Sequence, residues 1–281
     1  MSIHPTAIID STAQLGHGVE VGPYSIIGPH CVVGDNTRID SHVVLQRYVT
    51  LGADCQVCPG AVLGGLPQDM KYNGEVTYVR IGNGVIIREG VTVHRASGEG
   101  CQTVVGDKTL LMANAHVAHN CVVGSEVVLA NGALLGGHVE VGDFTFIGGG
   151  CAVHQFVKVG RMVILGGLSA ARQDLPPFAM VDSRPAFVVG LNKVGLKRRG
   201  VDLATRTRLK HAYKLLFFSP FNYKQAIEVI KAEIEPDPAV TELIEFIQNS
   251  PKGVYRIRRK SSAKAASAES DDVDILSRTM L

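Results

Sequence analysis

A six-residue repeat organises the chain from Ile3 to Leu165. Every sixth position in this range is Ile, Leu or Val, apart from two interruptions, and Gly often follows directly. A period of six fits neither the 3.6-residue turn of an α-helix nor the alternation of a simple strand, so it indicates a repeat solenoid. We expect each hexad to supply one short strand and one turn, with the aliphatic first position and the small fifth position facing inward.

Three hexads are expected to close one coil of a triangular prism. Neighbouring coils then pair as parallel strands about 4.8 Å apart, and each coil covers the hydrophobic face of the next. Residues separated by three hexads, which is eighteen positions, therefore stack in columns along the prism. The period itself does not fix the handedness of the coil.

Two polar, glycine-containing segments, 64–80 and 94–104, interrupt the repeat, and we expect them to loop out from the prism. Loops ejected from a rigid repeat often carry function. The solenoid is expected to occupy residues 1–190, and the helical spacing of later hydrophobic positions predicts a small helical domain over 191–260. The small and polar residues of the tail, 261–281, predict disorder.

The charge and hydropathy of the chain argue against two kinds of partner. A net charge of +2 gives no bulk electrostatic case for binding nucleic acid. No stretch approaches the ~18 apolar residues of a membrane span. Because the repeat has begun by Ile3, we expect no signal peptide and a cytoplasmic protein.

Four of the six cysteines fall at the fifth position of their hexads, where small residues occur elsewhere. They are Cys31, Cys55, Cys121 and Cys151. Cysteine at such a position is a small buried hydrophobe. A zinc ribbon would need a second close pair of cysteines besides Cys55 and Cys58, and the sequence has none. We therefore predict that these cysteines pack in the core and hold no metal.

Four of the ten histidines are expected to gather along one edge of the prism. The column of His119 continues through Gly137 and Gln155, because three hexads separate each of these positions from the next. The whole expected cluster is His116, His119, Gly137, His138, His154 and Gln155. Positions three and six of a hexad do not face inward, so His116 and His119 should stand on the outer surface. A neutral imidazole can act as a general base, whereas three imidazoles could hold Zn²⁺, and the residues alone leave both uses open.

A covalent nucleophile is poorly supported by the sequence. Cys121 occupies an inward position, and no serine lies in a nucleophile elbow. If the reaction is a group transfer, the acceptor itself is expected to be the nucleophile, activated directly by a histidine.

An ordered set of motifs closely resembles the acyl-carrier-protein-dependent UDP-N-acetylglucosamine O-acyltransferases, which catalyse the first step of lipid A biosynthesis. The motifs are Gln68-Asp69-Met70-Lys71-Tyr72, Asn114-Ala115-His116-Val117-Ala118-His119, Gly136-Gly137-His138-Val139, Val153-His154-Gln155-Phe156 and the junction Gly190-Leu191-Asn192 to Gly195-Leu196-Lys197-Arg198-Arg199-Gly200. The hexad repeat alone does not distinguish this family from other proteins with the same repeat, but the ordered set of motifs together with the junction is highly specific for it. The resemblance covers about residues 1–259.

This resemblance implies a left-handed parallel β-helix with a C-terminal helical domain, and a homotrimer with sites between subunits. It implies no cofactor, an acyl carrier protein as acyl donor and UDP-N-acetylglucosamine as acceptor. His119 matches the base that removes the proton from the sugar 3-hydroxyl. The backbone N–H of Gly137 matches the donor to the oxyanion, and glycine suits that role because it admits close approach.

The resemblance also assigns substrate contacts. His116, His138, His154 and Gln155 match substrate-binding positions, and Asp69 and Lys71 match loop residues that reach the sugar and acyl groups from the neighbouring subunit. Asn192, Arg198 and Arg199 match the nucleotide site, where guanidinium groups suit diphosphate oxygens. Gly167 falls where relatives use side-chain bulk to measure acyl length, so a long acyl chain is expected.

Three positions depart from the pattern of relatives, and three other functions compete. Asn120 stands where well-known relatives carry Asp, and Pro185 and Val194 replace His and Glu found in some relatives. The competing functions are a zinc hydratase similar to the γ-carbonic anhydrases, an N-acyltransferase acting on an acylated sugar amine, and a scaffold without catalysis. Read alone, Lys197-Arg198-Arg199 is also typical of a solvated helix start.

Overall fold

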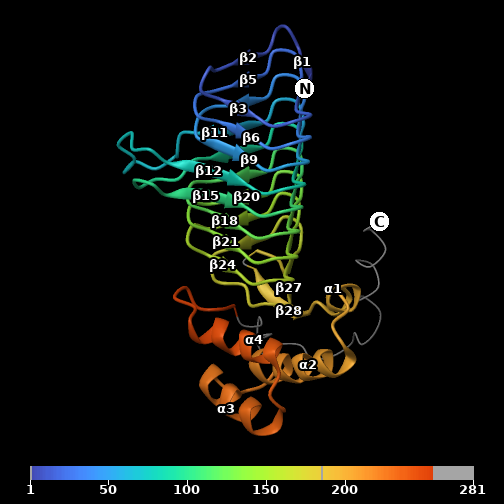
Figure 1. Cartoon of the computed structure of the whole chain (residues 1–281). Coiled ribbons are helices and arrows are strands. Elements are labelled where there is room, and N and C mark those ends of the chain that lie inside the picture. The colour runs from blue at the N-terminus through green and yellow to red at the C-terminus, as the bar shows by residue number, and fades with distance from the viewer. Residues whose placement is uncertain (1, 185, 256–281) are drawn as a thin grey trace.

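A computed structural model describes residues 2–184 and 186–255 of the chain. It shows a long three-sided column of stacked strands, with helices gathered at the C-terminal end of the column (Figure 1). The predicted disordered tail, 261–281, lies outside the described residues, as do the basic cluster at 256–260 and Pro185.

The strands form three sheets, one for each side of the prism. Sheet A contains β1 (Ser2–Ile3), β4 (Glu20–Val21), β7 (Arg38–Ile39), β10 (Gln56–Val57), β13 (Ile86–Ile87), β16 (Leu110–Leu111), β19 (Val128–Leu129), β22 (Phe146–Ile147), β25 (Ile164–Leu165), β27 (Ala179–Asp182) and β28 (Phe187–Leu191). Sheet B contains β2 (Ile8–Ile9), β5 (Ile26–Ile27), β8 (Val44–Leu45), β11 (Val62–Gly65), β14 (Thr92–His94), β17 (His116–Val117), β20 (Leu134–Leu135), β23 (Ala152–Val153) and β26 (Ala170–Ala171). Sheet C contains β3 (Gln14–Leu15), β6 (Val32–Val33), β9 (Val49–Leu51), β12 (Tyr78–Ile81), β15 (Gln102–Val105), β18 (Val122–Val123), β21 (Glu140–Val141) and β24 (Lys158–Val159).

The chain visits the sheets in the order A, B, C and then begins the next coil, so it forms a three-sided parallel β-helix. Strands of neighbouring coils pair in parallel with partners three hexads apart, such as Ile3 with Val21 and Leu135 with Val153. The predicted coil of three hexads is therefore confirmed. Each coil has three corners, which we name A–B, B–C and C–A after the sheets that meet there.

The two interruptions explain why the hexad phase survives along the whole chain. Strand partners lie five hexads apart across the first loop, as for Leu63 and Val93, and four hexads apart across the second, as for Val93 and Val117. The loops thus lengthen their coils by two hexads and by one hexad, so each addition is a whole number of hexads. Columns that cross a loop have to be counted from strand pairing rather than from a fixed coil length.

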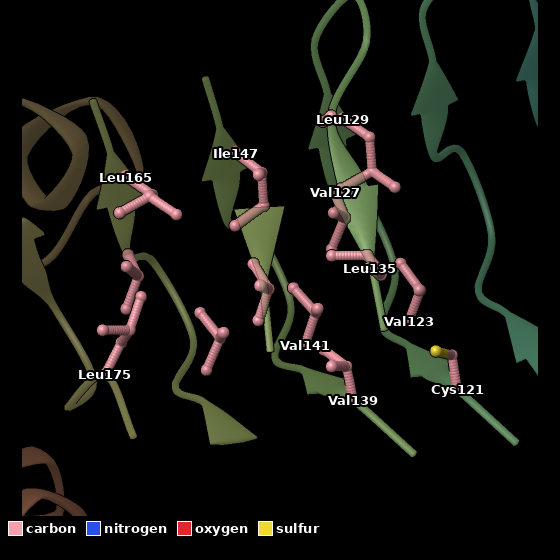
Figure 2. Packing of buried hydrophobic residues seen from close by; sticks show 14 of the residues in the cluster. Cys121, Val123, Val127, Leu129, Leu135, Val139, Val141, Ile147, Leu165 and Leu175 are labelled. Carbon is pink, nitrogen blue, oxygen red and sulfur yellow. The ribbon is translucent and has the colours of Figure 1, made fainter. Parts of the chain in front are cut away.

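The core of the prism consists of the two hexad positions that the sequence predicts to face inward. Every first position from Val21 to Leu165 is buried, and Figure 2 shows several of these side chains stacked coil upon coil. Ile3 remains 40% exposed because no earlier coil covers it. Burying one such aliphatic side chain stabilises the fold by about 1.5–3 kcal/mol.

Small polar residues at the fifth position are compatible with burial because they bond to the next coil. The Thr145 hydroxyl donates to the Gly160 carbonyl oxygen at 2.9 Å. The thiol of Cys121 donates to the Gly136 carbonyl oxygen in the same manner, at 3.1 Å. All four cysteines at this position are buried and unpaired, which confirms the packing role predicted for them.

The C-terminal part closes the last coils and then becomes helical. Strand β28 pairs antiparallel with β27, and Asn192 caps the first of four helices in the described part of the chain. The helices are α1 (Lys193–Arg198), α2 (Leu203–Phe217), α3 (Tyr223–Glu233) and α4 (Pro238–Gln248). Arg161 donates to both carboxylate oxygens of Glu242 and so ties α4 to the prism. No helix in residues 2–184 and 186–255 has the length and hydropathy needed to cross a membrane.

Candidate active site

The histidine cluster and both ejected loops lie at the B–C corner of the prism. The first loop connects β11 to β12, and the second connects β14 to β15, so each passes from sheet B to sheet C. The turn that carries His119 makes the same crossing one coil later, between β17 and β18. Figure 1 shows the two loops projecting side by side from one edge of the column. Topology alone therefore places the loops beside the histidines.

His119 is buried, with only 8% of its surface exposed, which corrects the expectation that it stands on the outer surface. The hexad position does point away from the core, but the loops fold over it. Asn120, next to His119, bonds through its side chain to both the N–H and the C=O of Ser97 in the second loop. The error arose because a hexad pattern gives side-chain direction and contains no information on the path of an ejected loop.

The predicted column is confirmed by direct contacts between successive turns. The His138 N–H donates to the His119 carbonyl oxygen at 3.0 Å, and the Phe156 N–H donates to the Gly137 carbonyl oxygen at 3.0 Å. The His138 ring stands edge-on to that of His119 at 5.2 Å and stacks on that of Phe156 at 4.6 Å. These contacts hold three coils in one rigid arrangement.

Gly137 lies directly against the imidazole of His119. A Cβ atom built on Gly137 would be 2.5 Å from Nε2 and 2.6 Å from Cε1 of that ring. Among the described residues, none accepts a hydrogen bond from the Gly137 amide. The base candidate and an unsatisfied backbone donor therefore border the same small volume.

A fifth histidine, His94, joins the cluster and was missed at the level of sequence. Its ring lies edge-on to that of His116 at 4.9 Å, and His116 Nδ1 bonds to the Thr92 hydroxyl at 2.7 Å. The strand pairing of Val93 with Val117, four hexads further on, brings His94 close to the cluster. A count of three hexads back from His116 does not reach His94, which is why stacking by a fixed coil length overlooks it.

The imidazoles suppress one another's protonation. Burial, followed by the charges of His116 and His119, lowers the pKa of His94 to about 4. Burial, followed by His119, also lowers the pKa of His116 and of His138. Crowding of like charges and poor solvation both disfavour the charged ring. These three rings are therefore neutral near pH 7 and can serve as hydrogen-bond partners.

Asp69 and Lys71 lie at the same corner within a single chain. The Lys71 backbone N–H, followed by the Ser97 side chain, holds the pKa of Asp69 below its usual range, and the charge of His119 acts in the same direction. Both Asp69 and Lys71 are close enough for their charges to act on His138. The resemblance placed these residues at a neighbouring subunit's site, whereas here the loop lies beside the histidines of its own chain.

Two further predicted residues, His154 and Gln155, lie at the next turn of the corner. Both are exposed, and His154 Nδ1 is 3.1 Å from the Gln155 carbonyl oxygen. They border the histidine column on its open side, where a ligand can reach them.

The remaining predicted residues lie at other corners of the prism. Gly167 follows β25 at the A–B corner, and it is exposed. Arg199 lies at the C–A corner, where it pairs with Glu126 at 2.6 Å and covers the ring of Phe144 at 4.2 Å. The single chain therefore does not bring these residues to the histidines.

The junction around α1 shows the surroundings of the residues assigned to the nucleotide and corrects the expectation of a helix start. The amide of Asn192 is buried and bonded within the chain, because it donates to the Met162 carbonyl oxygen and accepts from the Gly195 N–H. Lys197 and Arg198 end a short helix rather than starting one. Arg198 and Val194 are exposed. Arg199 is exposed as well, but its guanidinium group pairs with Glu126, whereas Arg198 makes no ion pair within the described residues.

Metal binding was the second use that the sequence left open for the imidazoles. Within residues 2–184 and 186–255, no group of three or more His, Cys, Asp or Glu side chains is placed to hold a metal ion. The cluster instead offers one imidazole nitrogen beside a backbone N–H, surrounded by neutral rings, one carboxylate and one ammonium group. Such a set can accept a proton and stabilise a developing oxyanion.

Comparison with known families agrees with this geometry. Residues 174–255 match the family described as UDP N-acetylglucosamine O-acyltransferase, domain 2. Residues 1–35, 30–65 and 102–137 match the bacterial transferase hexapeptide family. The helical end and the solenoid are thus recognised independently.

Individual relatives match along nearly their whole length. The chain is 52% identical to the acyl-[acyl-carrier-protein]–UDP-N-acetylglucosamine O-acyltransferase of Chlorobaculum tepidum, over 90% of this chain and 96% of that protein. It is 46% identical to the enzyme of the same name from Thermodesulfovibrio yellowstonii, over 90% and 99%. The solved UDP-N-acetylglucosamine acyltransferase of Bacteroides fragilis is 32% identical, with a TM-score of 0.88 over 90% of this chain and 99% of that chain.

Proposed function

Because this chain belongs to the acyl-[acyl-carrier-protein]–UDP-N-acetylglucosamine O-acyltransferase family, we propose that it transfers an (R)-3-hydroxyacyl group from acyl carrier protein to the 3-hydroxyl of UDP-N-acetylglucosamine, with His119 as general base. The observation that carries the assignment of the base is the contact of Gly137 with His119 Nε2. A proton acceptor and an oxyanion donor side by side are the two groups that acyl transfer to an alcohol requires.

In the first step, His119 Nε2 removes the proton of the sugar 3-hydroxyl while the oxygen forms a bond to the thioester carbonyl carbon. The π electrons of that carbonyl move to its oxygen, which becomes an oxyanion. The Gly137 N–H donates to this oxyanion. Removing one such donor typically costs about 10²–10³ in kcat.

In the second step, the tetrahedral intermediate collapses and the carbon–sulfur bond breaks. The thiolate of the carrier protein leaves and takes the proton from the imidazolium of His119. The products are the acylated sugar nucleotide and the free thiol of the carrier protein. No covalent acyl-enzyme forms on this path. Burial raises the pKa of the Cys121 thiol to about 12, which agrees with the absence of a thiolate nucleophile at that position.

The other residues of the corner are proposed to hold the sugar and the acyl group. Asp69 accepts from sugar hydroxyl groups, and Lys71 supplies a positive charge. His116 and His138 offer uncharged rings along the column, and His154 and Gln155 offer exposed polar groups at its next turn. Neutral rings can approach both the hydroxyl and the thioester without repelling the imidazolium that forms on His119.

We further propose a homotrimer, because the assigned residues are distributed over three corners. His119 lies at B–C, Gly167 at A–B, and α1 is anchored at C–A through Arg199. A threefold assembly of parallel prisms brings different corners of neighbouring copies together. In that arrangement Arg198 of one copy reaches the diphosphate, and Asn192 and Arg199 hold α1 in place at the same site.

The exposed apolar side chains of sheet B support contact between copies. Ile8, Ile26 and Leu134 point outward from this sheet and are 64%, 40% and 47% exposed. Ile8 and Ile26 are direct neighbours on successive strands, and contiguous exposed apolar patches mark interaction surfaces. Light scattering tests the trimer directly. Mixing His119→Ala with Arg198→Ala protein should restore activity if each site combines residues from two copies.

The test of the function is product mass spectrometry with UDP-N-acetylglucosamine and a mixture of 3-hydroxyacyl carrier proteins. A 3-O-acylated product, lost in His119→Ala while the melting temperature is retained, is expected. Near-normal kcat in His119→Ala would refute the assignment of the base. A stoichiometric metal with hydratase activity, or acylation of a sugar amine only, would favour one of the competing enzymes.

A further inference from the structure

The side chain of Asn120 has one hydrogen-bonding orientation only. Its Nδ2 group donates to the Ser97 carbonyl oxygen at 3.0 Å, and its Oδ1 atom accepts from the Ser97 N–H at 2.9 Å. A backbone carbonyl cannot donate and a backbone N–H cannot accept, so exchanging the nitrogen and oxygen of the amide would lose both bonds. The main chain of the second loop thereby decides which atom of Asn120 faces His119.

The atom that faces His119 is an acceptor. Oδ1 of Asn120 lies 2.9 Å from His119 Nδ1. An amide oxygen cannot donate a hydrogen bond, so Nδ1 must carry the proton when the ring is neutral. The other nitrogen, Nε2, is then the one with a free lone pair, and it is the nitrogen beside Gly137.

We propose that Asn120 and the main chain of Ser97 form a positioning pair, which keeps the proton of neutral His119 on Nδ1 and leaves Nε2 as the proton acceptor. The proposal rests on the role of His119 as base. It assigns a function to Ser97, and to an amide at position 120, that the resemblance does not provide. Asn120 does not touch substrate and acts only through His119.

The pair also connects the base with the first loop. The Ser97 side chain lies close enough to the Asp69 carboxylate to help lower its pKa, while the Ser97 main chain holds Asn120. The next residue, Gly98, donates its N–H to Glu75 of the first loop at 2.7 Å. The substrate-binding carboxylate and the tautomer of the base are therefore set by one residue of the second loop.

A carboxylate at position 120 would change this arrangement in two ways. It could accept from His119 Nδ1 and from the Ser97 N–H, but it could not donate to the Ser97 carbonyl oxygen. It would also place a negative charge beside the imidazole, and an opposite charge favours the protonated ring. In this chain, Asn120→Asp should therefore move the acidic limb of the kcat/KM profile to higher pH.

The experiment compares Asn120→Ala, Asn120→Asp and Ser97→Ala in the full chain. Asn120→Ala should lower kcat about 10–100-fold with little change in KM, by analogy with outer partners of functional histidines. Ser97→Ala removes the hydroxyl group near Asp69 but keeps the main-chain pair, so it should raise KM for the sugar nucleotide and leave the pH profile in place.

Asn36→Ala is the matched control. Asn36 occupies the same hexad position with the same left-handed backbone, φ 58° against 60° for Asn120, and lies far along the chain from the cluster. It reports the cost of removing asparagine from such a turn. An Asn120→Ala enzyme as active as Asn36→Ala would overturn the proposal.

The tautomer can be read without any activity. In ¹⁵N-histidine NMR of the wild-type protein above its histidine titrations, the His119 signals, assigned by their loss in His119→Ala, should show a protonated Nδ1. A proton on Nε2 would refute the positioning pair even if the variants fail to fold. If His119→Ala retained activity while Nδ1 proved protonated, the assignment of the base would fall and the tautomer assignment would stand.

Discussion

Gly137→Ala should inactivate the enzyme without unfolding it. The added Cβ would lie 2.5 Å from His119 Nε2, whereas an ordinary carbon–nitrogen contact is about 3.5 Å. The backbone at Gly137 is fixed by strand pairing on both sides, so the imidazole has to give way by about 1 Å. The expected damage is therefore to the position of the base rather than to the fold.

The magnitude follows from the sensitivity of proton transfer to distance. A displacement of about 1 Å in a reacting group can cost on the order of 100-fold in rate, or about 2.7 kcal/mol in the activation free energy. We expect kcat to fall by about that factor and KM to change little, because the residues assigned to substrate binding are untouched. The assay is steady-state transfer from a hydroxyacyl carrier protein, together with a thermal melt.

Gly149→Ala is the matched control. Gly149 holds the same third hexad position at the A–B corner, and a Cβ there would meet only the Asn131 carbonyl oxygen at 3.4 Å. This variant should retain activity and melting temperature. If Gly137→Ala were as active as Gly149→Ala, the contact between Gly137 and the base would not be catalytic. If both variants lost activity equally, a general intolerance of the turns would explain the effect.

Three further predictions use other parts of the structure. The free energy of unfolding should fall as the pH drops from about 6.5 to 4, because His94 is protonated in the unfolded chain but stays neutral in the folded one. The expected loss is about 2 kcal/mol after allowing for partial exposure. In His94→Asn, the free energy of unfolding measured by urea denaturation should change less over that pH range. Gly167→Met should shift the preference from fourteen-carbon towards ten-carbon donors in a competition assay, since a Cβ at Gly167 has room for a side chain; an unchanged preference would remove Gly167 from the acyl site. Arg198→Ala should raise KM for UDP-N-acetylglucosamine without altering the melting temperature. Arg199→Ala should lower the melting temperature, because the ion pair with Glu126 is lost. If the two variants changed KM and melting temperature equally, the separate roles of Arg198 in binding and Arg199 in anchoring α1 would be contradicted.

The hexad proved sufficient to predict the core and the histidine column. Inward positions follow from the period, and stacking of every third hexad predicts that Gly137 lies over His119. The burial of His119 could not be predicted in the same way, because it depends on loops that leave the repeat. His94 was overlooked for a related reason, since the second loop lengthens the coil and shifts the count.

The junction residues show a different limit of the sequence. The resemblance assigns Asn192 and Arg199 to a nucleotide, and within the single chain Asn192 also caps α1 and Arg199 also rests on Phe144 and Glu126. Both uses depend on which corner of the prism α1 packs against. That choice is made by contacts between residues far apart in the sequence, such as Arg199 and Glu126, and no local pattern encodes it.

The hydrogen bonds from His138 to His119 and from Phe156 to Gly137 have a consequence for how this enzyme tolerates change. The spacing between base and oxyanion donor follows the backbone rise of one coil, so it depends more on these backbone bonds and the ring contacts of His138 than on the packing of the core. A substitution in the core can therefore lower the stability of the fold without changing kcat. A core substitution such as Leu135→Val should lower the free energy of unfolding, while the molecules that remain folded keep the same kcat.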